Sequence, residues 1–132
     1  MSDPTPDPMD ELVFSDELDC PCCRANEAVA PFVAWLRETR EPAIEALLLA
    51  QATAITALEQ LGAADMAVAP WARLRIQALV DETRARCFPE PTLGAVRSIV
   101  THLLAFLMLH RLLAPRDKQR LRRQVRLVRA RS

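Results

Sequence analysis

The sequence predicts an all-α fold: a four- to five-helix bundle with a disordered acidic N-terminus and a projecting basic C-terminal helix. Alanine, leucine and arginine, which favour helices, are abundant, whereas tyrosine is absent and glycine occurs only at Gly62 and Gly94. Apolar residues recur at the three- and four-residue spacing of helices. We therefore divide the 132 residues into an acidic arm (1–19), a helical bundle with a cysteine turn (20–115) and a basic amphipathic helix (116–132).

The first 19 residues hold seven acidic side chains and no basic one, so the arm carries a net charge of −7. Prolines alternate with these acids at Pro4, Pro6 and Pro8. Such a segment cannot bury enough apolar surface to fold, so we expect it to be largely disordered. An acidic start is also unlike the basic start of a secretory signal peptide, which favours a cytoplasmic protein.

The first helix is predicted to begin at Asn26, a residue type that caps helices, and to run to about Arg40. Phe32 and Leu36 are four residues apart, which places them on one face. Pro31 lacks an N–H group, so the regular part of this helix can begin there instead.

The next two helices are bounded by proline and glycine. The second is predicted over 42–61, with proline at its first position and Gly62 just beyond its end. A linker over 63–69 separates it from a third helix over 70–87, whose apolar residues include Trp71. The outer face of the third helix is rich in arginine: Arg73, Arg75, Arg84 and Arg86.

The apolar run over 93–113 is the predicted axis of the bundle. Thr92 can cap its start, and the part from 103 to 109 is apolar on every side, so a helix here must be enclosed by others. His102 and His110 flank that part. Because a membrane span needs roughly 20 mostly apolar residues, we predict a core helix and no span.

The last helix is predicted over 115–130. Its apolar residues Leu121, Val125 and Val128 form a narrow seam, and arginines occupy most of the remaining circumference. One narrow seam holds a helix weakly in a bundle. We therefore expect this helix to project, or to become ordered on a partner.

The four cysteines suggest a metal site. Cys20-Pro21-Cys22-Cys23 contains a C-P-x-C turn, which resembles the turn of a zinc knuckle and can direct two sulfurs to one ion. Tetrahedral zinc, the possible cofactor, needs two further ligands. The candidate metal ligands are Cys20, Cys23, Cys87 and Cys22, with His102, His110 or a second subunit as other sources of the fourth. Zinc shared between two chains, Cu(I) on the C-x-C pair, a thiol switch and reduced cysteines without metal remain open alternatives.

The basic C-terminal segment suggests a nucleic-acid partner. Residues 116–132 carry a net charge of +7, and arginine forks two donors to a phosphate. The candidate nucleic-acid-binding residues are Arg116, Lys118, Arg120, Arg122, Arg123, Arg126, Arg129 and Arg131. Since the segment holds no aromatic residue for base stacking, we expect weakly sequence-selective backbone contacts. The alternatives are a protein groove, the acidic arm of the same or a neighbouring chain, an anionic membrane surface, or a helix that is merely solvated.

No glycine-rich phosphate loop, paired-histidine motif or nucleophile elbow occurs, so we do not expect an enzyme. The leading hypothesis is a small helical regulator or adaptor, oligomeric and stabilised by zinc, whose arginine-rich helix contacts nucleic acid. The alternative is a protein–protein interaction or scaffold module that uses its oppositely charged ends to bind partners or copies of itself, without nucleic acid.

Overall fold

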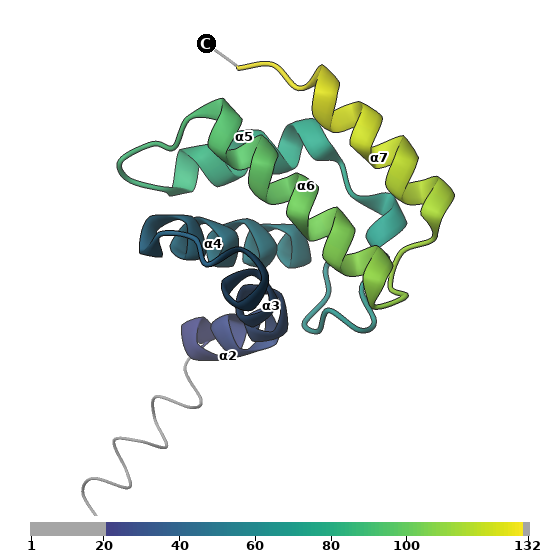
Figure 1. Cartoon of the computed structure of the whole chain (residues 1–132), viewed down its shortest axis with the longest axis horizontal. Helices are drawn as coiled ribbons and strands as arrows, with labels where there is room; N and C mark the ends of the chain where they lie inside the picture. Colours follow the sequence, from purple (N-terminus) through teal and green to yellow (C-terminus); the bar gives the residue numbers. More distant parts are fainter. Residues whose placement is uncertain (1–20, 131–132) are drawn as a thin grey trace, which may run out of the picture.

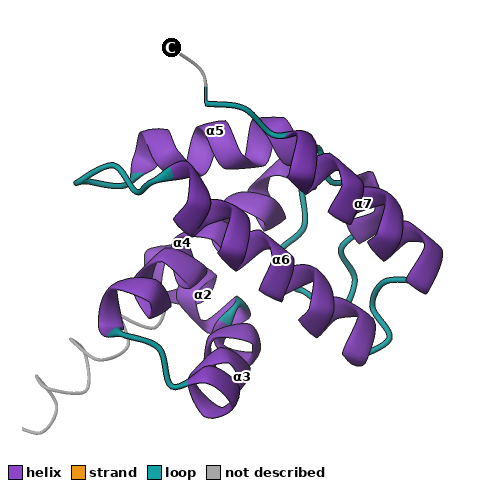
Figure 2. Cartoon of the chain, turned by 45° about the horizontal axis from the view of Figure 1, so that its top comes forward, coloured by secondary structure: helices purple, strands orange, loops and turns teal. Residues whose placement is uncertain are grey.

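A computed structural model describes residues 21–130, except for the side chains of Pro21 and Cys22. This part of the chain forms six α-helices and one short 3₁₀ turn and contains no strand (Figures 1 and 2). The all-α prediction is therefore confirmed. The elements are α2 (Pro21–Ala28), α3 (Ala30–Arg40), α4 (Ile44–Gln60), η1 (Trp71–Arg73), α5 (Ile76–Arg86), α6 (Leu93–Leu109) and α7 (Pro115–Leu127).

The helix α6 is the axis of the fold, as its apolar sequence predicts. It contacts α3, α4, α5 and α7, and the Thr92 side chain accepts a hydrogen bond from the Ala95 N–H at 3.1 Å to cap its start. Its buried residues are Val96, Ile99, Val100, Leu103, Leu104, Phe106 and Leu107. Within residues 21–130, no helix has both the length and the apolar character that a membrane crossing requires.

The predicted first helix is divided in two. Val29, with φ −102° and ψ 3°, separates α2 from α3. Pro31 lies in the first turn of α3, where its missing N–H costs nothing, but it would remove a hydrogen bond from one continuous helix. The split raises the number of helices above the four or five predicted.

The predicted end of α4 at glycine is confirmed. Gly62 adopts the left-handed conformation with φ 66°, and the Ala63 N–H donates to the Leu58 carbonyl at 3.0 Å. This is the hydrogen-bond pattern of a Schellman C-cap. A side chain at Gly62 would be strained by this φ, although space is open around it.

The predicted continuous helix over 70–87 is wrong. Extended backbone at Leu74 and Arg75 separates η1 from α5. In a single helix, Leu74 and Ile76 would point to nearly opposite sides, whereas the break allows both to be buried. The Gln60 side chain accepts from the Arg75 N–H at 2.8 Å and donates to the Arg75 carbonyl at 3.2 Å, so the interrupted backbone remains hydrogen-bonded.

The axial helix is shorter than its apolar run. It ends at Leu109, and Arg111 adopts a left-handed conformation with φ 61°. The Leu112 N–H then donates to the Leu107 carbonyl at 2.8 Å. This turn returns Leu113 to the core, where it is 6 % exposed.

The prediction that the C-terminal helix projects from the bundle is also wrong. In Figure 1, α7 lies along α6, and it contacts α5 and η1 as well. Leu121 is completely buried, and Val125 and Val128 are 4 % and 6 % exposed. The narrow apolar seam is sufficient because three neighbouring elements enclose it.

Candidate nucleic-acid interface

One side of α7 and the residues that follow it form an exposed basic surface. We call it the basic face and define it as Arg116, Arg122, Arg123, Arg126 and Arg129, all of which are exposed. From Arg116 to Arg126 the helix rises about 15 Å. The basic face is therefore long enough to lie along several phosphates of a nucleic-acid strand.

Hydrogen bonds from neighbouring elements fix α7 from beneath. Arg120 donates from Nη2 to the Ala72 carbonyl at 2.8 Å. Just beyond the C-terminal end of α7, the Gln77 side chain donates to the Arg129 carbonyl at 2.9 Å and accepts from the Arg129 N–H at 3.2 Å. The backbone that carries the basic face is thus held near the middle of α7 and just after its end.

The structure separates the eight predicted nucleic-acid-binding residues into three groups. The five residues of the basic face point to solvent. Lys118 and Arg120 are half-buried. The Arg120 guanidinium already binds two groups of the protein, the Ala72 carbonyl and the Asp117 carboxylate, which is 3.4 Å away. Arg131 lies outside the described residues.

None of the five arginines of the basic face forms an ion pair with an acid of residues 21–130. The only acid on α7 is Asp117, which pairs with Arg120. The positive charge of the basic face is consequently not neutralised by the described part of the fold.

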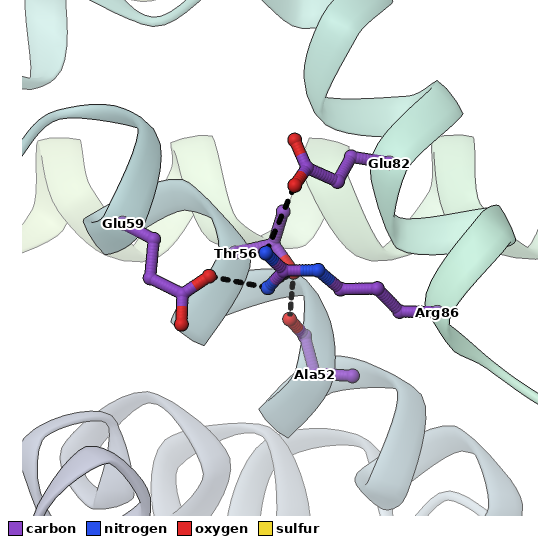
Figure 3. Close-up of polar contacts among 5 residues, drawn as sticks. All are labelled: Ala52, Thr56, Glu59, Glu82 and Arg86. Carbon is purple, nitrogen blue, oxygen red and sulfur yellow. Dashed lines mark hydrogen bonds and ion pairs between the residues drawn. The ribbon is translucent and has the colours of Figure 1, made fainter. Parts of the chain in front are cut away.

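The arginines at the end of α5 behave differently. The Arg86 guanidinium lies between Glu59 and Glu82 (Figure 3) and also donates to the Thr56 hydroxyl at 3.3 Å. The hydrogen bond to Glu59, followed by the charges of both acids, raises the pKa of Arg86 above its ordinary value. The arginine-rich face predicted for this helix is therefore partly used within the fold, because Arg86 connects α5 to α4.

Arg84 is occupied in the same way. Its Nε donates to the Pro91 carbonyl at 3.1 Å and lies 3.6 Å from Glu90. Such partly exposed pairs contribute about 0–1 kcal/mol each to stability. Their relevance here is that they distinguish structural arginines from the unpaired ones of the basic face.

One further arginine borders the basic face and was not predicted from the sequence. Arg97 of α6 donates to the Arg126 carbonyl at 3.4 Å. Arg97 is distant from α7 along the chain, so no local pattern connects it to the basic face.

The cysteine turn is not observed. Pro21–Ala28 is the helix α2, so Cys23 lies in a helix that packs against α3 and α4. Cys87 caps the end of α5, and α4 lies between that end and α2 in Figure 1. Cys20 and the Cys22 side chain lie outside the described residues. Among those that are described, no three Cys, His, Asp or Glu side chains are placed to hold a metal ion, and zinc binding stays a prediction.

Burial raises the pKa of the Cys87 thiol above its ordinary value. Because the thiolate is the reactive form, we expect iodoacetamide to modify Cys87 several-fold more slowly at neutral pH than an unstructured cysteine peptide. The rate should rise at a higher pH than that of the peptide. Mass spectrometry of the Cys87 peptide measures the rate of modification at each pH. An equal rate would contradict the prediction, and protection that a chelator removes would instead identify a metal ligand.

Comparison with known proteins adds nothing to the functional assignment, which therefore depends on the residues described above. No protein-family model matches the chain, and neither curated proteins nor solved structures gave a match.

Proposed function

We propose that the protein binds the phosphate backbone of nucleic acid through the basic face, as a small helical regulator or adaptor. The observation that supports this proposal is that the five exposed arginines on and after α7 have no ion-pair partner within residues 21–130. Because α7 is already docked, little backbone entropy is lost when its guanidinium groups bind a partner. They are suited to forked hydrogen bonds with phosphates.

The proposed binding is electrostatic and depends on salt. Each arginine that neutralises a phosphate releases condensed counterions. If all five residues make a contact, the logarithm of the binding constant falls with the logarithm of salt concentration with a slope of about −4.5. A fourfold increase in salt then weakens binding about 500-fold.

Removing three of the five charges is expected to weaken binding strongly. The variant Arg122→Gln, Arg123→Gln, Arg126→Gln leaves two arginines on the basic face, so the salt slope should fall to about −2. The measurement is fluorescence anisotropy with a labelled DNA duplex and a labelled single strand at several salt concentrations.

The matched control removes the same number of charges from the other side of the molecule. Arg24, Arg37 and Arg40 are exposed residues of α2 and α3, and neither helix contacts α7. Their replacement by glutamine should leave both affinity and slope nearly unchanged. Equal losses in the two variants would attribute binding to overall charge, and no binding by the full chain at low salt would reject the proposal.

The second candidate function is self-association or binding to another protein. Ile44 and Leu48 lie one turn apart on α4 and are 64 % and 58 % exposed. Exposed apolar side chains that share a helix face are typical of interfaces between proteins. A concentration-dependent dimer in sedimentation experiments, together with no binding to nucleic acid, would favour this function.

A further inference from the structure

A second surface feature is a groove of about 420 Å³ between α3, the segment 61–70 and the end of α6. We call it the aromatic groove. Trp35 and Glu38 line it from α3, Asp65 and Met66 from the connecting segment, and Phe106 and His110 from the end of α6. Pockets of this size hold small organic molecules.

Three neighbouring aromatic rings are among the residues that line the groove. The Trp35 and Phe106 ring centroids are 5.4 Å apart, and those of Phe106 and His110 are 4.3 Å apart. Phe106 is only 4 % exposed and forms part of the floor, whereas Trp35 is half-buried and His110 is exposed at the rim. A ring face that borders a solvent-accessible groove can attract a cation through its quadrupole.

Two acidic side chains, Glu38 and Asp65, line the groove. Glu38 and Asp65 are both exposed, and neither forms an ion pair within residues 21–130. One Asp65 oxygen accepts from the Ala67 N–H at 2.8 Å, which orients the carboxylate. No lysine or arginine is among the described residues that line the groove. Two carboxylates from separate segments therefore line an apolar, aromatic groove, and neither has an ion-pair partner among the described residues.

From this arrangement we propose that the aromatic groove binds an organic cation that has an apolar body, of the arylalkylammonium class. The apolar body lies against Trp35, Met66 and Phe106. The ammonium group lies at the rim, where Glu38 and Asp65 attract it. Charge complementarity selects this ligand over neutral or anionic molecules of the same shape.

Three ligands of nearly equal size test the proposal: 2-phenylethylammonium, 2-phenylethanol and phenylacetate. NMR titration of the full chain reports on the groove through the indole N–H of Trp35. We expect saturable shifts of this resonance with the ammonium ligand, about tenfold weaker binding of the alcohol and no binding of phenylacetate. Equal affinities for all three ligands, shifts that map elsewhere, or no shifts at all would overturn the proposal.

The variant Glu38→Gln, Asp65→Asn separates charge from shape, because asparagine retains the oxygen that accepts from Ala67. This variant should reduce the affinity for the ammonium ligand about five- to tenfold and change the affinity for the alcohol by less than about twofold. The matched control is Glu41→Gln, Glu45→Gln, which removes two charges from exposed acids that do not line the groove. An ammonium affinity that is unchanged in the double variant, or reduced equally in the control, would reject the role of the two carboxylates.

Discussion

Replacement of Leu121 by alanine is expected to destabilise the protein by about 2 to 5 kcal/mol. The Leu121 side chain is completely buried, and it belongs to the seam that fixes α7 against α6, α5 and η1. The substitution leaves a cavity in this packing. Urea denaturation followed by circular dichroism measures the change in the free energy of unfolding.

The neighbouring variant Arg122→Ala is the control. Arg122 is exposed and has no ion pair within residues 21–130, so its replacement should change stability by no more than about 0.5 kcal/mol. A similar, small effect of both substitutions would mean that α7 is not docked.

Deleting the chain from Pro115 onwards exposes the surface beneath the seam. The deletion therefore removes stability together with charge and cannot serve as a neutral test of nucleic-acid binding.

Replacement of Trp71 by alanine is expected to cost about 3 to 5 kcal/mol. Trp71 is 1 % exposed, and its Nε1–H donates to the Met66 carbonyl at 2.8 Å, which attaches the segment before η1 to the core. The variant removes a large buried side chain and leaves that carbonyl without its donor. Thermal unfolding monitored by circular dichroism measures the loss.

Two further tryptophan variants show where the loss of stability in Trp71→Ala comes from. Trp71→Phe keeps most of the packing but loses the hydrogen bond, so it should cost about 1 to 3 kcal/mol. Trp35→Ala should cost less than Trp71→Ala, because the Trp35 side chain is only half-buried. A Trp71→Ala protein as stable as the Trp35→Ala protein would contradict the assignment of Trp71 to the core.

The docking of α7 changes how the basic face would work. A projecting helix would have to become ordered on its partner, and the cost of ordering would reduce its affinity. Here the backbone is already fixed through Arg120, Gln77 and the buried seam. Only the arginine side chains remain to be ordered on binding.

The candidate interface could be predicted from the sequence only as a set of residues. The high density of arginine after Pro115 identifies the segment, but it does not distinguish Arg120, which donates to Ala72, from the exposed arginines. It likewise does not show that Arg86 is occupied by Glu59 and Glu82. Apart from the local pair of Arg86 with Glu82, these contacts come from residues that are distant along the chain.

Local chemistry in the sequence determined the helical class, the cap at Thr92, the stop at Gly62 and the burial of α6. Each of these follows from neighbours within a few residues or from an apolar run that must leave water. Only the tertiary structure decided the break at Leu74 and Arg75 and the docking of α7. The physical reason is that Gln60 satisfies the broken backbone from another helix, and that a narrow seam becomes stable only when α5, α6 and η1 enclose it.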